Sequence, residues 1–235
     1  MDYNKQANID LSYLDRLGYF KKDYENLILK FPDSELIENN YSQAMQDMFV
    51  LSMLDGKKDG FYIELGANNP ISINNTYLLE NMYGWSGISF DINNDEVSYF
   101  NSIRKNKCIC ADATKFDYKF LFDYTNAPKQ IDYLQLDCDP PYITLQCLLK
   151  LPLDSYRFSV ITFETDLYAG GRDVQVKQEE VLSFYGYKRV VKNVCNVSCP
   201  PLPYEDWWVD PLVIPENVWG QFSNDNIEFK KIMLK

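Results

Sequence analysis

The stretch FYIELGANNPISINNTYLLENMYGWSGISFD, residues 61–91, predicts a strand, a helix and a second strand in succession. Its two ends, 61–65 and 87–91, are short apolar runs of strand length, and 74–83 between them has a helical pattern. Gly66 follows the first run at once, which favours a turn directly out of the strand. We therefore expect a β–α–β unit at this point in the chain.

The same alternation continues toward the C-terminus and predicts one large α/β domain. The expected strands are 61–65, 87–91, 108–111, 132–137, 158–164, 187–192 and 204–210, and the expected helices are 74–83, 95–105, 116–124, 143–150 and 173–185. This pattern is typical of a mostly parallel sheet, here seven-stranded, with helices on both faces.

The first 55 residues have a different pattern, in which leucines such as Leu11, Leu14 and Leu17 recur at helical spacing. The stretch YSQAMQDMFVLSMLDG, residues 41–56, predicts a further helix that ends close to Gly56. No repeat or linker interrupts the chain. We assign 1–40 to an N-terminal helical extension and 41–235 to a single domain.

Composition narrows the choice of partners. The net charge is −11, and no Lys or Arg cluster is longer than a pair, which argues against a nucleic acid partner because duplexes bind through phosphate neutralisation. No apolar run is long enough to span a bilayer, and the N-terminus lacks a signal-peptide pattern. We therefore expect a cytoplasmic protein with no membrane insertion.

Histidine is absent, so any acid–base chemistry falls to Asp, Glu, Lys, Tyr or Cys. The six cysteines do not form a C-x-x-C zinc knuckle, and we interpret them as reduced, mostly buried residues rather than metal ligands.

Carboxylates stand at or beside the ends of four successive expected strands: Glu64, Asp91, Asp112 and Asp137. Ligands of open parallel sheets bind at the carboxyl ends of the strands, where an acidic residue after the second strand commonly holds a ribose diol. No glycine-rich phosphate-binding motif follows a strand. A nucleoside with a cationic amino-acid tail fits this pattern, and S-adenosylmethionine is such a molecule.

Several motifs in order resemble the FkbM-type S-adenosylmethionine-dependent methyltransferases. They are YSQAMQD (41–47), FYIELGAN (61–68), NTYLLE (75–80) and GWSG (84–87), and the likeness extends to YEDWWVDP near residue 211. The resemblance implies a Rossmann-like methyltransferase fold. The chain departs from the family where Cys138-Asp139-Pro140-Pro141 replaces the more usual V/I-E-G-x-E run.

The resemblance, together with the strand ends, implies a set of cofactor-binding residues. They are Gln43, Asp47, Glu64, Gly66, Asn68, Asn75, Asp91, Ile92, Asp112, Ala113 and Asp137. Helix capping or packing remains an equal alternative for Gln43, Asp47 and Asn75.

The tetrapeptide Asp139-Pro140-Pro141-Tyr142 matches the D-P-P-Y motif of methyltransferases that modify nucleobase amino groups. In those enzymes the acidic residue stands at the tip of the fourth strand, but here Asp137 occupies the tip. The offset of two residues moves Asp139 by roughly 6–7 Å, and we expect it to leave the methyl-transfer pocket. We favour a loop stiffened by the prolines and retain the nucleobase site as the alternative.

Methyl transfer requires removal of the acceptor's proton, for which Asp137, Asp139 and Glu164 are the candidate catalytic bases. The same three carboxylates could instead hold a divalent cation such as Mg²⁺. The stretch PPLPYEDWWVDP (200–211) provides Trp207 and Trp208 for the rim of a sugar site, although one Trp buried in the core with its neighbour on the other face of the strand is an equal alternative. Tyr168 and Arg172 are candidates for a lid.

The sequence therefore predicts an S-adenosylmethionine-dependent enzyme that methylates a hydroxyl on a saccharide or glycan. The alternatives are an amino-group methyltransferase acting on a nucleobase and a catalytically silent binding module with the same fold. The acceptor and the oligomeric state do not follow from the sequence.

Overall fold

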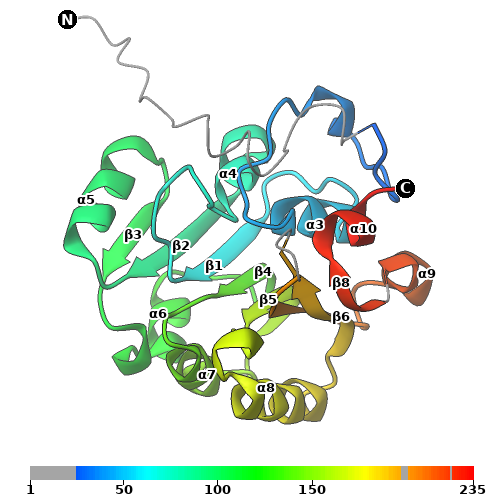
Figure 1. The fold of residues 1–235 in the computed structure, drawn as a ribbon. Coiled ribbons are helices and arrows are strands. Elements are labelled where there is room, and N and C mark those ends of the chain that lie inside the picture. Colours follow the sequence, from blue (N-terminus) through cyan, green and yellow to red (C-terminus); the bar gives the residue numbers. More distant parts are fainter. Residues whose placement is uncertain (1–24, 197–200, 223) are drawn as a thin grey trace, which may run out of the picture.

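The computed structural model describes residues 25–196, 201–222 and 224–235, and its centre is one eight-stranded sheet (Figure 1). The strand order is β3-β2-β1-β4-β5-β7-β6-β8. The strands are β1 Phe61–Leu65, β2 Ser86–Asp91, β3 Lys107–Cys110, β4 Gln130–Leu136, β5 Arg157–Glu164, β6 Lys188–Cys195, β7 Pro203–Val209 and β8 Asn224–Glu228. Strands β1 to β5 run parallel to one another, whereas β7 runs antiparallel to its neighbours β5 and β6.

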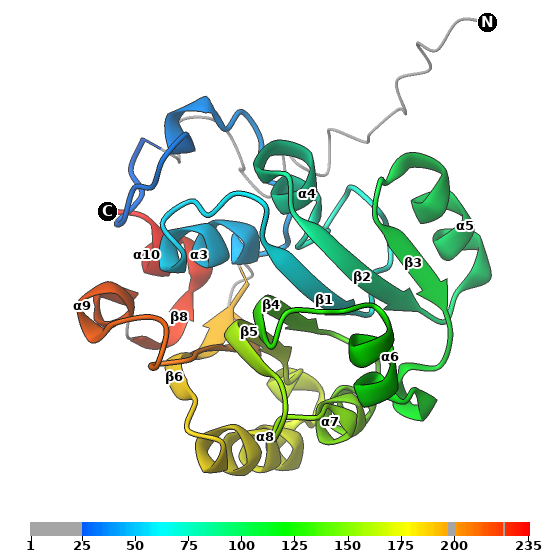
Figure 2. The same ribbon diagram turned by 180° about the vertical axis from the view of Figure 1, so that it is seen from behind.

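Helices cover both faces of the sheet (Figure 2). The α-helices are α3 Gln46–Met53, α4 Tyr77–Tyr83, α5 Asn94–Ile103, α6 Tyr118–Tyr124, α7 Pro141–Lys150, α8 Arg172–Phe184, α9 Glu216–Trp219 and α10 Phe229–Met233. Helices α3, α4 and α10 lie on one face, and α6, α7 and α8 on the other. The predicted α/β fold with a mostly parallel sheet is therefore confirmed.

The seven expected strands are all present, but the predicted strand number is wrong because β8 adds an eighth. Its sequence, NDNIE, contains one apolar residue and so carries no strand signal. The strand forms because it pairs in parallel with β6, where Ile227 is opposite Val194. Tertiary pairing thus overrides a weak local preference.

Strand β7 is covered on both faces, so the predicted aromatic sugar rim is wrong. Trp207 is 0% and Trp208 is 1% exposed, and they belong to the cores on opposite faces of the sheet. Successive side chains of a strand point to opposite faces, which is the alternative that the sequence left open. Asp206 and Asp210 are also buried, and Arg157 holds Asp210 through two short contacts of 2.7 and 2.9 Å.

The expected helical extension is not observed where the structure can test it. Residues 1–24, including Leu11, Leu14 and Leu17, lie outside the described residues. In 25–45 the regular structure is one 3-10 turn, Ser34–Leu36, an isolated bridge between Leu27 and Leu234, and a single bridge residue at Asn39. Leu27, Phe31 and Ile37 are buried in the core that α3 and β7 share. Long-range packing, rather than helical periodicity, places these residues.

Among the described residues no helix has both the length and the apolar character needed to cross a membrane.

Candidate functional site

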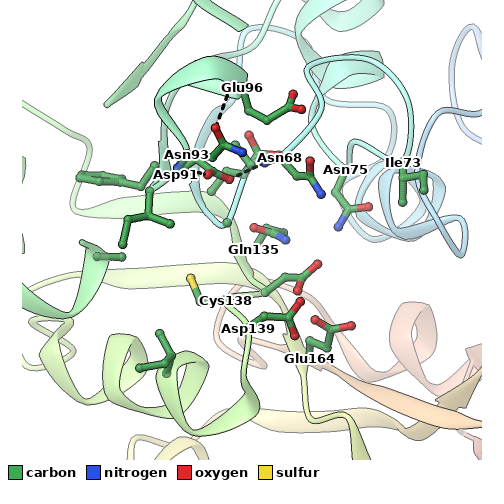
Figure 3. Close-up of a pocket in the computed structure, with 18 of the residues that line it drawn as sticks. Asn68, Ile73, Asn75, Asp91, Asn93, Glu96, Gln135, Cys138, Asp139 and Glu164 are labelled. Carbon is green, nitrogen blue, oxygen red and sulfur yellow. Dashed lines mark hydrogen bonds between the residues drawn. The ribbon is translucent and has the colours of Figure 1, made fainter. Parts of the chain in front are cut away.

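A cavity of about 920 Å³ opens at the carboxyl ends of β1 to β5 (Figure 3). It lies where the strand order reverses, because β1 is followed in the chain by β2 on one side and pairs with β4 on the other. Such a switch point is the usual ligand site of an open parallel sheet. All four predicted strand-end carboxylates, Glu64, Asp91, Asp112 and Asp137, line this cavity.

Gly66 sets the narrow contact between the tips of β1 and β4. Its φ is +88°, and a Cβ atom at this position would lie 1.7 Å from the backbone oxygen of Asp137. The Asp137 backbone N–H in turn donates to the Leu65 carbonyl at 3.0 Å. Only glycine permits both the left-handed conformation and this close approach, so Gly66 shapes the cavity floor.

Glu64 is buried on β1, and both of its carboxylate oxygens accept a hydrogen bond. The Ser89 hydroxyl donates to Oε2 at 2.6 Å and the Thr76 hydroxyl donates to Oε1 at 3.0 Å. Burial raises the pKa of Glu64 to about 7, because desolvation outweighs the attraction of Arg104 and these two hydrogen bonds. The side chain is thus close to balance between its charged and neutral forms near neutral pH.

Asp91 ends β2 and accepts hydrogen bonds from two backbone N–H groups of residues that line the cavity. Its Oδ2 accepts the Asn68 N–H at 2.8 Å and its Oδ1 accepts the Asn93 N–H at 2.7 Å. A carboxylate has about four acceptor positions, so two remain for a ligand. Ile92 follows with an exposed side chain that also lines the cavity.

Asp112 follows β3 and caps a 3-10 turn, Ala113–Lys115. The Thr114 N–H and hydroxyl donate to Oδ1 at 3.0 and 2.6 Å, and the Lys115 ammonium lies 3.0 Å from Oδ2. These hydrogen bonds lower the pKa of Asp112 to about 2. Asp112 is therefore a carboxylate at every physiological pH, with Ala113 beside it on the cavity wall.

Two amide side chains that line the cavity are buried without a partner for their oxygen. Asn75 is 6% and Gln135 is 3% exposed, and neither amide oxygen accepts a hydrogen bond. Figure 3 shows Gln135 between the Asp91 side and the Glu164 side of the cavity. Buried polar atoms without partners are uncommon in native proteins and call for an explanation such as a ligand.

The carboxylates at the ends of β4 and β5 contact one another at the cavity wall. Asp137 and Glu164 share a side-chain hydrogen bond, which requires one of them to carry the proton. Burial and the neighbouring Asp137 raise the pKa of Glu164 far above its usual range. The pair therefore holds one proton between two oxygens.

Asp139 also lines the cavity, so the expectation that it leaves the pocket is wrong. Two hydrogen bonds to Thr144 fold the loop back on itself: the Cys138 N–H donates to the Thr144 hydroxyl at 3.0 Å, and that hydroxyl donates to the Cys138 carbonyl at 2.7 Å. The two-residue offset along the chain therefore does not become a displacement out of the site. Tyr142 lines the cavity as well and is 55% exposed.

Sequence reasoning missed Asp166, which completes a group with Asp139 and Glu164. One carboxylate oxygen from each lies within 4.8 Å of the others. The sequence suggested Asp137, Asp139 and Glu164 as ligands of a possible cation, and two of these three belong to the group. The signal was present in FETD, where a second carboxylate follows Glu164 by two residues, but the bend after β5 was not predictable.

The remaining predicted residues divide between the cavity and its surroundings. Gln43, Asn68 and Tyr168 line the cavity, whereas Asp47 and Arg172 do not. Asp47 is fully buried, where it accepts hydrogen bonds from Asn40, from the Ser42 hydroxyl at 2.7 Å and from the Met48 N–H at 2.8 Å. For Asp47 the structure therefore favours the packing alternative. The five described cysteines are free thiols.

Eight carboxyl side chains line the cavity, and no lysine or arginine is among its described lining residues. The eight are Glu64, Asp91, Glu96, Asp112, Asp137, Asp139, Glu164 and Asp166. Phosphate groups bind proteins mainly through Lys, Arg and backbone N–H groups. The charge of this cavity thus favours a cationic or hydroxyl-rich ligand over an anionic one.

No family model and no curated protein matches the sequence. Among solved structures, a candidate rRNA methylase from Clostridium thermocellum superimposes with a TM-score of 0.51 at 12% identity, over 74% of this chain and 97% of that one. The human methyltransferase 10 domain containing protein superimposes with a TM-score of 0.46 at 14% sequence identity, over 80% of this chain and 91% of that one. A SAM dependent methyltransferase from Archaeoglobus fulgidus superimposes with a TM-score of 0.42 at 15% sequence identity, over 71% of this chain and 91% of that one.

These similarities concern the fold alone, because sequence identities this low do not show that the site residues are shared. The C. thermocellum superposition, together with the strand order and the helices on both faces, shows that the chain has a Rossmann-like methyltransferase fold.

Proposed function

We propose that the protein is an S-adenosylmethionine-dependent methyltransferase that methylates a hydroxyl of a saccharide. The observation that carries the proposal is the gathering of Glu64, Asp91 and Asp112 around Gly66 in one cavity at the switch point of the sheet. These groups come from three different strands and meet only through the fold. The resemblance of residues 41–93 to FkbM-type enzymes supports the same conclusion.

The residues present fit the cofactor. Asp91 has two acceptor positions left for the ribose hydroxyls, and Asp112 with Ala113 lies where an adenine amino group would be held. Glu64 and the partnerless oxygens of Asn75 and Gln135 provide acceptors for the ammonium group of the amino-acid tail. When bound, the cofactor supplies an electrophilic methyl group on a sulfonium.

The carboxylates of β4 and β5 supply the base for the acceptor. The acceptor oxygen would take the methyl group from the sulfonium sulfur, and its hydroxyl proton would pass to a carboxylate. We assign this step to Asp137, which lines the cavity and shares a hydrogen bond with Glu164. The burial that raises the pKa of Asp137 makes it a stronger base than an exposed aspartate.

A saccharide acceptor fits the polarity of the cavity. Sugar hydroxyls donate hydrogen bonds to carboxylates and to amide oxygens, and both kinds of acceptor line the wall without basic residues between them. An acceptor that carries phosphate close to its reacting atom is disfavoured, because its negative charge would face the eight carboxyl groups of the cavity.

Isothermal titration calorimetry with S-adenosylmethionine and S-adenosylhomocysteine tests the cofactor assignment. We expect saturable binding of both, and no binding of ATP, whose triphosphate the acidic cavity repels. Failure of both adenosyl ligands to bind would overturn the proposal. Transfer of a labelled methyl group to a library of glycans and nucleotide sugars then tests the acceptor class.

One observation favours a second candidate, the amino-group methyltransferase acting on a nucleobase. Asp139 and Tyr142 of the D-P-P-Y stretch line the cavity that would hold the methyl donor. Labelled methyl transfer to DNA or RNA that is abolished in Asp139→Ala and retained in Asp137→Ala would establish this activity. Cofactor binding without transfer to any acceptor would instead indicate a binding module.

A further inference from the structure

The group Asp139, Glu164 and Asp166 is an unusual concentration of negative charge at the β5 side of the cavity. One oxygen from each carboxylate lies within 4.8 Å of the other two. None of the three forms an ion pair with a lysine or arginine of the described chain. Figure 3 shows the carboxylates of Asp139 and Glu164 side by side at the cavity wall.

A second, independent observation indicates that this group is incomplete without a ligand. Asp166 is 7% exposed, lines the cavity, and its Oδ1 is buried without a hydrogen-bond donor. The Tyr168 hydroxyl donates to the Asp166 carboxylate and still leaves Oδ1 without a partner. The Gln135 oxygen, also buried and partnerless, lines the same cavity. A buried carboxylate oxygen with neither donor nor cation is strongly unfavourable.

We propose that Asp139, Glu164 and Asp166 form a binding site for a hard divalent cation, with Mg²⁺, Mn²⁺ and Ca²⁺ as the class of ligand. All three donors are carboxylate oxygens, which these cations prefer. Two oxygens bound to one Ca²⁺ are at most about 5 Å apart, and two bound to one Mg²⁺ at most about 4.2 Å. Because the three oxygens lie within 4.8 Å of one another, a modest inward movement of these side chains would bring them to a shared ion.

The fold holds the buried ligand in place. The Asp166 N–H donates to the Tyr204 carbonyl of β7 at 2.9 Å, and the neighbouring Thr165 N–H donates to the same oxygen at 2.6 Å. Asp166 therefore has its backbone attached to the sheet, whereas Asp139 is exposed on its loop. This combination gives one rigid ligand at the wall and one that can adjust to the ion.

The site has a consequence that rests on the proposed function. Glu164 belongs to the proposed cation site and is hydrogen-bonded to Asp137, the proposed base. A cation there would bind the acceptor hydroxyl and lower its pKa, so that transfer of the proton to Asp137 becomes easier. The cation would thus select acceptors that present an oxygen, and it would neutralise part of the charge that four clustered carboxyl groups create.

Direct titration of the purified protein with MgCl₂, MnCl₂ or CaCl₂ tests the site, followed by calorimetry and by thermal melting. We expect saturable binding of at least one cation and a rise in Tm with its concentration, because a ligand that binds only the folded state stabilises it. Asp166→Asn and Glu164→Gln should weaken cation binding at least tenfold and remove the rise in Tm. Asp173→Asn, an exposed carboxylate on α8, should change neither.

Folding of the variants is checked without any cation. Replacing a clustered carboxylate by its amide relieves repulsion, so the Tm of Asp166→Asn in a chelator should equal or exceed that of the wild type. S-adenosylmethionine binding is measured separately on the same samples. Cation binding without cofactor binding would sustain the site and defeat the proposed function. Absence of cation binding by the wild type, or full retention by both variants, would overturn the site.

Discussion

Around the cavity, the carboxylates at or beside the ends of β1, β2 and β3 each accept hydrogen bonds from hydroxyl or backbone N–H groups, whereas those at or beside the ends of β4 and β5 mainly contact one another. Glu64, Asp91 and Asp112 each accept at least two such bonds. Glu164 has Asp137, Asp139 and Asp166 around it instead. The carboxylates of the β1–β3 half are thus held by hydrogen-bond donors before a ligand binds, whereas those of the β4–β5 half mainly contact other carboxyl groups.

The difference indicates a division of labour between the two halves. Carboxylates held by donors keep their geometry and charge, which suits recognition of a cofactor with fixed hydroxyl and amino groups. Carboxylates that crowd one another bind a proton or a cation readily, which suits the chemistry at the acceptor.

The largest expected effect comes from Gly66→Ala, which would disrupt the contact between the two halves. A Cβ atom 1.7 Å from the Asp137 oxygen, on a residue with φ +88°, forces the tips of β1 and β4 apart. We expect a loss of at least about 3 kcal/mol in the free energy of unfolding. Chemical denaturation measures this loss, with Gly186→Ala as the matched control.

Gly186 also has a positive φ, +81°, but no atom lies within 4 Å of its hypothetical Cβ. The control should therefore lose only about 1 kcal/mol, the cost of the left-handed conformation. Equal losses in the two variants would show that the close contact at Gly66 is unimportant.

The second largest effect is expected for Asp91→Ala, in the β1–β3 half of the cavity. The substitution removes the proposed ribose acceptor and frees the Asn68 and Asn93 N–H groups. We expect affinity for S-adenosylmethionine to fall about 100-fold, because hydrogen bonds to a charged group contribute about 1.5–3 kcal/mol. Calorimetry measures the change, and exposed Asp95→Ala is the control. Undiminished affinity in Asp91→Ala would contradict the assigned role.

The pH dependence of stability provides a third and smaller test, through Glu64. Its pKa of about 7 in the folded state exceeds the usual value of 4.5, so the folded protein binds more protons than the unfolded chain between these pH values. Stability from this group therefore falls as the pH rises from about 4.5 to 7. Because glutamine does not titrate, Glu64→Gln should reduce this pH-dependent loss in the free energy of unfolding by about 2 kcal/mol or less.

Thermal melts of the wild type and Glu64→Gln across this pH range measure the effect, with exposed Glu35→Gln as the control. The curves should differ most at pH 7 and converge toward pH 4.5. Parallel curves over the whole range would show that Glu64 does not retain its proton in the folded state.

The smallest effect is expected for Asp112→Asn. The amide oxygen can still accept from Thr114, so the cap persists, while the ion pair with exposed Lys115 is lost. Exposed ion pairs contribute at most about 1 kcal/mol, so stability should change little. Loss of the charge beside the proposed adenine position should weaken S-adenosylmethionine binding by less than about tenfold in calorimetry. A loss as large as that of Asp91→Ala would place the ribose contact at Asp112 instead.

Local pattern was sufficient to predict much of this molecule. Apolar runs of strand length located seven of the eight strands, because a strand buried on both faces must be apolar along its length. The gathering of Glu64, Asp91, Asp112 and Asp137 followed from the same pattern, since parallel strands bring their carboxyl ends to one margin. The turn at Gly66 was also predictable, because this glycine directly follows the apolar run of β1.

Only the tertiary structure decided where the loops after the strands run and where segments distant in the chain pack. The bend after β4 brings Asp139 back into the cavity, and the attachment of Asp166 to Tyr204 brings a fourth carboxylate beside it. Strand β8 forms through pairing with β6, and residues 25–40 pack into the core without forming the expected helix. Local sequence determines the period and polarity of an element, whereas the path of a loop depends on contacts with residues far away in the chain.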